Sequence, residues 1–102
     1  MKKFTDICPD VRTTVMQRDS IDGHPCCIYC GSPRYLEIAH YVPRSRGGMG
    51  VPENLAVLCT KCHRALDNGS DIALARDIKE VFRFWLAFNY PNWNEEGVTY
   101  RK

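Results

Sequence analysis

The sequence lacks an apolar run long enough to cross a bilayer, and it has no internal repeat, low-complexity tract or long linker. No apolar stretch follows the basic first residues, so we expect no signal peptide and a cytoplasmic protein without membrane contact. The net charge is only +2, which by itself neither favours nor excludes a nucleic-acid partner. With 102 residues, 44% of them hydrophobic, the chain is expected to form one globular domain over residues 1–102.

Basic side chains are concentrated in the middle of the chain. Residues 34–64 contain two acids, Glu37 and Glu53, against five basic residues: Arg34, Arg44, Arg46, Lys61 and Arg64. Residues 65–100 contain three basic residues against six acids. This local excess of positive charge is typical of a surface that binds a phosphate-rich partner.

The order of apolar and turn-forming residues predicts a small α+β fold. Residues 9–19 begin with a helix-compatible proline and are expected to form a short helix. Residues 35–42 are rich in strand formers, and residues 54–59 are expected to pair with them antiparallel. The residues between these strands, 43–53, contain two prolines and three glycines and therefore predict a loop.

Two helices are expected after this hairpin. The first begins near Thr60 and ends at Asn68 or Gly69, residue types that adopt the left-handed conformation at helix ends. Ser70 is a suitable N-cap for a second helix over residues 71–90, where apolar residues recur at helical spacing. Aromatic residues in such a pattern usually belong to a core, so we expect packing rather than base stacking from them.

Six cysteines include two C-x2-C pairs, Cys27 with Cys30 and Cys59 with Cys62. Each spacing lets two thiolates reach one tetrahedral ion, and the intervening residues leave room for a hairpin. The sequence therefore predicts a zinc ion that staples the hairpin at its base. Because four thiolates saturate zinc, this ion is expected to be structural rather than catalytic.

Alternatives remain open for the cysteines. In a reducing compartment two C-x2-C pairs favour a metal over disulfides, but buried or disulfide-bonded cysteines are the other interpretation. Cys8 and Cys26 are left over, and we interpret both as free thiols because Cys27 makes the standard spacing to Cys30.

Three polar residues accompany the cysteines in the pattern H-x13-N-x4-C-x2-C-H: His40, Asn54 and His63. The run "IAHYVPRSRGGMGVPENLAVLCTKCHRAL" resembles the HNH endonucleases, in the subgroup with four zinc-binding cysteines. The resemblance covers about residues 11–68, with a motif core at about 24–68, and includes the preceding "V-x-x-R-D". The C-terminal tail is more weakly similar to small phage-type members.

This resemblance implies a fold and a reaction. The fold is the ββα-metal arrangement, a two-stranded antiparallel hairpin plus helix, flanked here by an N-terminal and a long C-terminal helix. His40 corresponds to the general base, Asn54 to the residue that orients the loop or the base, and His63 to a ligand of one catalytic divalent cation such as Mg²⁺ or Mn²⁺. The expected activity is nicking or double-strand cleavage of DNA that leaves a 5′ phosphate.

One position departs from the family pattern. Many members have a metal-binding acid or histidine directly before the first histidine, whereas this chain has Ala39, which offers no ligand atom. Asp67 follows His63 by four residues on the same helix face and is the preferred replacement. Glu37 lies on the same strand face as Ala39 and is the alternative. A third interpretation makes His40 itself a ligand.

The loop after His40 is interpreted as a substrate clamp. Arg44 and Arg46 can bind phosphate bidentately, and Gly47 and Gly48 let a backbone approach it closely. Lys61 and Arg64, on the helix of His63, complete the predicted DNA-binding set: Arg44, Arg46, Lys61 and Arg64.

Three functions compete on this evidence. The leading hypothesis is a DNA endonuclease of low intrinsic sequence specificity, because no element resembles a base-reading helix. Ala39 makes a non-catalytic zinc module that binds DNA or a protein the alternative. A structural adaptor that docks its aromatic helix on a partner is the third. The phage-like tail suggests phage packaging or other DNA-processing proteins as partners, by analogy alone.

Overall fold

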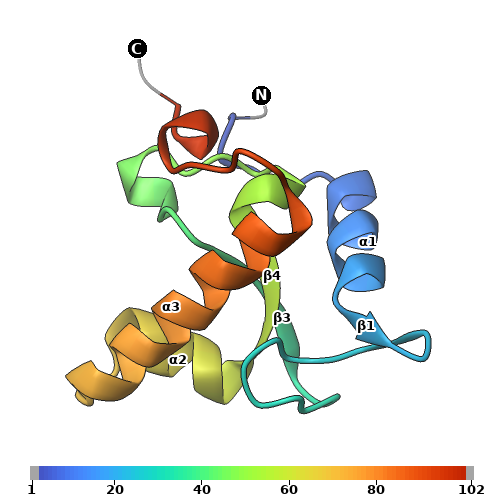
Figure 1. The fold of residues 1–102 in the computed structure, drawn as a ribbon, viewed down its shortest axis with the longest axis vertical. Helices are drawn as coiled ribbons and strands as arrows, with labels where there is room; N and C mark the ends of the chain where they lie inside the picture. The colour runs from blue at the N-terminus through green and yellow to red at the C-terminus, as the bar shows by residue number, and fades with distance from the viewer. Residues whose placement is uncertain (1–2, 101–102) are drawn as a thin grey trace.

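The computed structural model describes residues 3–100, in which a central two-stranded hairpin is flanked by helices (Figure 1). This is the predicted α+β architecture; residues 1–2 and 101–102 of the predicted domain lie outside the described residues. The elements are α1 (Pro9–Arg18), β1 (Ser20–Ile21), β2 (His24–Pro25), β3 (Leu36–His40), β4 (Leu55–Cys59), α2 (Thr60–Asn68) and α3 (Ile72–Asn89), with 3-10 turns η1 (Arg44–Arg46), η2 (Pro52–Asn54) and η3 (Glu96–Val98). None of the helices in residues 3–100 combines the length and apolar character needed to cross a bilayer.

The central hairpin separates two apolar clusters. Strands β3 and β4 pair antiparallel in the register Leu36–Cys59 to His40–Leu55, as expected from the two strand patterns. Ile38 faces α1, where it packs with Val15, while Ala39 faces α2 and α3 and packs in the cluster that includes Phe82. The strand thus buries both faces, and His40 stands at its end.

The long helix α3 places its predicted apolar stripe against the hairpin. Ile78, Phe82 and Leu86 are buried, as their spacing predicts. The expectation that all its aromatic residues belong to the core is wrong for Phe84 and Phe88, which are 67% and 71% exposed. They are four residues apart and stack on one another on the outer face of the helix.

The junction between α2 and α3 differs from the prediction in two details. Helix α2 ends at Asn68, but Gly69 has φ −71° and is extended rather than left-handed. The glycine is needed for a different reason, because a Cβ there would lie 2.6 Å from the Ala65 carbonyl oxygen. The N-cap of α3 is Asp71 and not Ser70: the Asp71 carboxylate accepts a 3.0 Å hydrogen bond from the Leu74 N–H.

A short hairpin, β1–β2, was not expected. Its turn is Asp22-Gly23, and both residues have positive φ, as a type I′ turn requires. The dipeptide Asp-Gly is the sequence signal for this turn, but the flanking strands are only two residues each. Strands this short show no alternation of polar and apolar residues, so the pattern is not visible in the sequence.

A buried ion pair joins the helices to the hairpin. Arg18 and Asp19, the "R-D" that follows α1, are in contact at 2.6 Å and are almost wholly buried. Asp19 also accepts hydrogen bonds from the Val57 N–H of β4 and from the indole of Trp85 in α3. Arg18 donates to the Leu55 carbonyl. Because hydrogen bonds connect this buried pair to β4 and to α3, the pair fixes the packing of α1, β4 and α3 against each other.

The predicted irregular loop at 43–53 is more ordered than expected, because it contains η1 and η2 and is held by both ends of the described chain. The Gly50 N–H donates to the Phe4 carbonyl at 2.8 Å, and the Tyr100 N–H donates to the Gly47 carbonyl at 2.7 Å. Gly48 forms an antiparallel bridge with Thr99. Figure 1 shows the two terminal segments side by side above this loop.

Candidate active site and metal centre

Four sulfur atoms meet at the base of the hairpin. Cys27 and Cys30 come from the turn before β3, Cys59 ends β4, and Cys62 lies in the first turn of α2. Their ligand atoms all lie within 4.8 Å of one another, and the sulfurs of Cys30 and Cys59 are 3.6 Å apart. The turn is held in place by the Ile28 N–H, which donates to the Val57 carbonyl of β4.

This cluster fits a zinc ion. Zinc–sulfur bonds of about 2.3 Å place tetrahedral sulfurs about 3.8 Å apart, close to the observed spacing. Burial raises the pKa of the Cys62 thiol, and hydrogen bonding to Cys59 adds to the shift, so a cation is needed to stabilise the thiolates together. Cys8 and Cys26 lie outside this cluster, consistent with their interpretation as spare cysteines.

A second group of polar side chains lines a groove of about 630 Å³ between β3, η1 and α2. His40 and Arg44 lie on one side of this groove, and His63 and Asp67 lie on the other. Ile7, Ile38, Pro43 and Ser45 complete its lining. The structure thus brings together four of the residues that the sequence singled out, directly beside the cysteine cluster, because His63 follows Cys62 in α2.

His40 is oriented by a backbone carbonyl. Its Nε2 lies 3.0 Å from the carbonyl oxygen of Thr5. A carbonyl only accepts hydrogen bonds, so Nε2 carries the proton and Nδ1 of the neutral ring has a free lone pair. Burial lowers the pKa of His40, and the charges of Arg44 and His63 add to this effect, whereas the Thr5 carbonyl and Asp67 oppose it. The ring is therefore neutral near pH 7.

His63 lies between two carboxylates. Its Nδ1 is 2.7 Å from Glu37 Oε1, and its Nε2 is 3.1 Å from Asp67 Oδ2. The hydrogen bond from His63 lowers the pKa of Glu37, and the Thr60 hydroxyl also donates to this carboxylate. Asp67 lines the groove together with His40, whereas Glu37 contacts the opposite edge of the His63 ring. Ala39 is fully buried, so its position offers nothing to the groove.

Asn54 is fully buried and holds the ends of the loop. Its side-chain oxygen accepts from the Val42 N–H at 2.8 Å, and its amide nitrogen donates to the carbonyls of Val42 and Met49. The Tyr41 N–H also donates to the Asn54 carbonyl. Asn54 therefore fixes the segment that carries Arg44, and it is a positioning residue rather than a group that touches a substrate.

The two arginines of the loop differ in their relation to the groove. Arg44 lines the groove and forms an ion pair with Asp6. Arg46 is not among the residues that line it. The structure thus brings only one of the two arginines of the predicted clamp into the groove.

The space beside the loop glycines is taken up by protein backbone. A Cβ on Gly47 would lie 2.5 Å from the Tyr100 carbonyl oxygen, and a Cβ on Gly48 would lie 1.6 Å from the Val42 carbonyl oxygen. These contacts give the glycines a structural role, and their predicted contact with a phosphate stays a prediction. The glycines allow the loop to pack closely against the rest of the chain.

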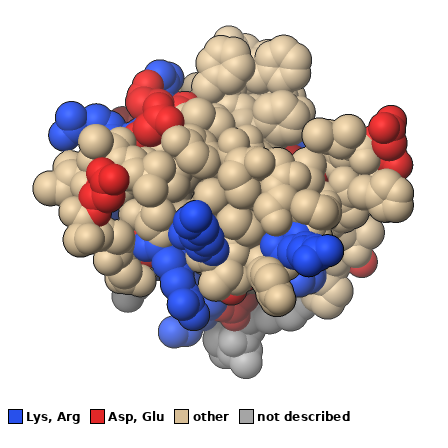
Figure 2. All heavy atoms as spheres, turned by 90° about the horizontal axis from the view of Figure 1, so that it is seen from below, with Lys and Arg blue, Asp and Glu red and all other residues tan. Residues whose placement is uncertain are grey.

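Lys61 and Arg64 lie on another surface. They line a depression of about 640 Å³ that also includes Arg34 and Tyr35, beside the cysteine cluster. In Figure 2, which views the molecule from below, several Lys and Arg side chains stand near the middle of the face, while Asp and Glu lie mostly toward its edges. Of the predicted DNA-binding residues, Arg44 thus lines the groove, Lys61 and Arg64 line this basic depression, and Arg46 lines neither.

Residues 27–69 match the family described as HNH endonuclease. The matched segment covers less than half of the chain. It contains the four cysteines and every polar side chain of the groove, so the resemblance to a four-cysteine HNH protein is confirmed. The weaker similarity to phage-type members stays a prediction.

Two restriction enzymes are similar to the chain. The "Type IV methyl-directed restriction enzyme EcoKMcrA" of Escherichia coli (strain K12) is 47% identical over 36 residues, which are 35% of this chain and 13% of that enzyme. The solved structure of the "Type IV phosphorothioation-dependent restriction endonuclease ScoMcrA" aligns with a TM-score of 0.51 and 25% identity, over 78% of this chain and 17% of that chain. This chain therefore spans less than a fifth of either relative.

The contribution of the N-terminal segment was not predicted from the sequence. Thr5 supplies the carbonyl that orients His40, Asp6 pairs with Arg44, and Ile7 lines the groove. These residues lie more than 30 positions before His40, outside the matched segment. A backbone carbonyl has no sequence signature, so its role is visible only in three dimensions.

Proposed function

We propose that this chain is a metal-dependent endonuclease that hydrolyses phosphodiester bonds of DNA in the groove between β3, η1 and α2. The observation that carries the proposal is the meeting of His40, His63, Asp67 and Arg44 in one groove of an HNH-family segment. Both relatives bear names of restriction enzymes, which act on DNA, and they support the same class of substrate.

His40 is the general base of the proposed reaction. A phosphodiester is hydrolysed when a water molecule loses a proton as it attacks phosphorus. The Thr5 carbonyl holds the proton of His40 on Nε2 and leaves Nδ1 to accept the proton of the water. Since burial keeps the ring neutral at pH 7, the base is ready without prior deprotonation.

His63 and Asp67 are the residues that would hold the divalent cation. When bound, such a cation stabilises negative charge on the leaving oxygen and on the non-bridging oxygens of the phosphate. Glu37 holds the proton of His63 on Nδ1, which directs the Nε2 lone pair toward the Asp67 side. This geometry supports Asp67 as the replacement for the ligand missing at Ala39, with Glu37 as the residue that orients His63.

Arg44 is the phosphate-binding residue of the groove. Its guanidinium pairs with the Asp6 carboxylate, and a DNA phosphate would exchange with that carboxylate for the same donors. Lys61 and Arg64 would contact the backbone of the duplex further from the cut, on the basic depression. These contacts bind phosphates and not base edges, so we expect little intrinsic sequence specificity.

A plasmid assay tests the proposal. Purified protein is incubated with supercoiled plasmid and Mg²⁺ or Mn²⁺, beside the variants His40→Ala and His24→Ala. His24 is an exposed histidine of β2, remote from the groove residues, and serves as the matched control. We expect the parent and His24→Ala to nick or linearise the plasmid, and His40→Ala to lose about 10²- to 10⁴-fold in rate.

Zinc content and the thermal unfolding transition, measured for each variant, show that the fold is retained. Equal cleavage by the parent and a folded His40→Ala protein would disprove the role of His40. No cleavage by the zinc-loaded parent with any divalent cation would favour the alternative, a non-catalytic module that binds DNA or a protein.

A further inference from the structure

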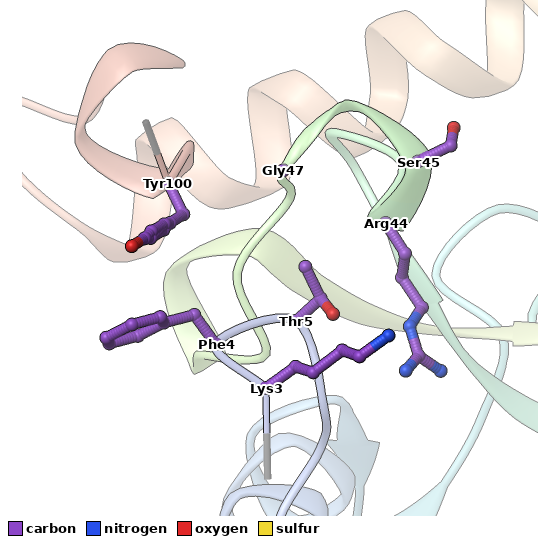
Figure 3. A pocket seen from close by; sticks show the side chains of 7 residues that line it. All are labelled: Lys3, Phe4, Thr5, Arg44, Ser45, Gly47 and Tyr100. Atoms are coloured by element: carbon purple, nitrogen blue, oxygen red, sulfur yellow. The ribbon is translucent and has the colours of Figure 1, made fainter. Parts of the chain in front are cut away.

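A second pocket adjoins the groove. It has a volume of about 600 Å³ and is lined by Lys3, Phe4, Thr5, Arg44, Ser45, Gly47 and Tyr100 (Figure 3). Arg44 and Ser45 line both this pocket and the groove of His40, so the two spaces are neighbours. A DNA strand with one phosphate at His40 would reach this pocket with a nearby nucleotide.

Two aromatic rings form one end of the pocket. Phe4 and Tyr100 have ring centroids 4.4 Å apart and are 65% and 37% exposed. Figure 3 shows the two rings beside each other. An exposed aromatic pair leaves ring surface uncovered, and every nucleobase has a flat face that can stack on such a surface.

The rings sit on a fixed backbone. The Phe4 carbonyl accepts from the Gly50 N–H, and the Tyr100 N–H donates to the Gly47 carbonyl, so both residues are tied to the same loop. The backbones of both residues are therefore held close to the loop that carries Arg44. A fixed backbone lowers the entropy that is lost when the rings are ordered by a stacked base.

The pocket is positively charged. In Figure 3 the amino group of Lys3 extends toward the guanidinium of Arg44, and none of the lining residues is an acid. Asp6, which pairs with Arg44, is the acid closest to this pair of cations in the contacts described above. Lys3 therefore leaves the pocket with a net positive charge. Beside the exposed rings of α3, Phe84 and Phe88, Arg83 is likewise paired with Glu80, and that pair contributes no net charge.

We propose that Lys3, Phe4, Arg44 and Tyr100 form a subsite for an unpaired nucleotide of the DNA strand being cut. The rings stack on its base, and the two cations bind its phosphate. A base within a duplex is stacked between its neighbours and is not free to lie on the rings. The proposal rests on the proposed nuclease function and deepens it, because it assigns a preference for single-stranded or locally unpaired DNA.

A binding experiment tests the subsite. Fluorescence anisotropy of the zinc-loaded full chain, without other divalent cations, is measured with a labelled 20-nucleotide single strand and with a duplex of the same sequence. We expect the double variant Phe4→Ala/Tyr100→Ala to bind the single strand between about fivefold and 100-fold more weakly, with little change for the duplex. Phe84→Ala, which removes an equally exposed ring from α3, is the matched control and should bind like the parent.

A second readout does not depend on a variant. A single strand containing 2-aminopurine loses fluorescence when that base stacks on a ring, so we expect the parent to quench it. Equal affinity of the parent for single strand and duplex, or no quenching, would overturn the subsite. The same conclusion follows if the double variant retains zinc and binds the single strand as the parent does.

These experiments can contradict the subsite and the nuclease function separately. A parent that cuts plasmid while the double variant binds single strands normally contradicts the subsite alone. A parent that binds single strands through these rings but cuts no DNA contradicts the nuclease and leaves the subsite supported.

Discussion

The cysteine cluster and the histidine groove are neighbours on α2, yet they are built in opposite ways. Cys62 and His63 are consecutive residues, but the first joins three other thiols and the second joins a groove of mixed side chains. The cluster uses four identical ligands from two C-x2-C turns, whereas the groove takes residues from the N-terminal segment, β3, η1 and α2. Two adjacent residues of α2 thus belong to different sites: Cys62 to the cysteine cluster and His63 to the groove.

The largest expected effect is the loss of zinc. Binding of structural zinc is worth about 10–16 kcal/mol in zinc-finger peptides, comparable to the total stability of a small domain. We therefore expect a strong chelator, or Cys62→Ser, to abolish the cooperative thermal transition followed by circular dichroism. Cys26→Ser, outside the cluster, should leave one zinc per chain and an unchanged transition. A chelated protein that unfolds like the parent would refute the structural role of the ion.

Asp19→Ala tests whether the fold also depends on a site without metal. The change leaves the Arg18 guanidinium buried without its carboxylate, and breaking a buried pair costs about 3–5 kcal/mol of unfolding free energy. Urea denaturation should show this loss with zinc still bound. Asp10→Ala, an exposed acid of α1, is the control. A loss below 1 kcal/mol would mean that the pair is not a main contributor to the packing of α1, β4 and α3.

Two acids around His63 are expected to differ in their effect on the catalytic cation. Asp67→Ala removes a proposed ligand and should abolish Mn²⁺ binding, whereas Glu37→Ala removes the orienting partner and should weaken it about 10- to 100-fold. Isothermal titration calorimetry of zinc-loaded protein measures both. Thermal transitions should stay close to the parent value, because both side chains are partly exposed. The reverse order of effects would make Glu37 the ligand.

The smallest expected effect is on the titration of His40. Its pKa lies below the usual 6.5, first through burial and then through the positive charges nearby. A base must be neutral, so cleavage should persist down to about pH 6.5 and be lost only as pH falls through this lowered pKa. Arg44→Gln removes one of the charges and should move the NMR titration midpoint of His40 upward. Arg34→Gln, a change outside the groove, should leave the midpoint of His40 unchanged. Equal midpoints in the parent, Arg44→Gln and Arg34→Gln would exclude this electrostatic coupling.

Sequence patterns predicted the elements that have local signals. Strands β3 and β4 are short runs rich in strand-forming residues on either side of a loop with prolines and glycines, and the C-x2-C spacing places four thiols together without knowledge of the fold. His63 and Asp67 also share a helix face by spacing alone. These features depend on residues close in sequence, or on a motif whose chemistry fixes the geometry.

The features that were missed depend on contacts between distant residues. The Thr5 carbonyl at His40 and the backbone carbonyls beside Gly47 and Gly48 have no side-chain signature. In the sequence Asp19 looks like an ordinary acid at a helix end. Only the structure shows that it accepts hydrogen bonds from the Val57 N–H and the Trp85 indole. Arg44 lines the groove and Arg46 does not, and sequence alone does not show which residue of the η1 turn faces the groove.

The loop at 43–50 is attached to both ends of the described chain, and this attachment affects when the groove forms during folding. Its lining comes from residues 7–67, and the loop that forms one of its walls is held by Tyr100, so it is complete only after contacts that span almost the whole sequence. Such contacts form late, because the intervening chain must first be ordered. The cysteine cluster and the hairpin, in contrast, need only residues 27–62. A growing chain would therefore be able to bind zinc well before the groove is complete.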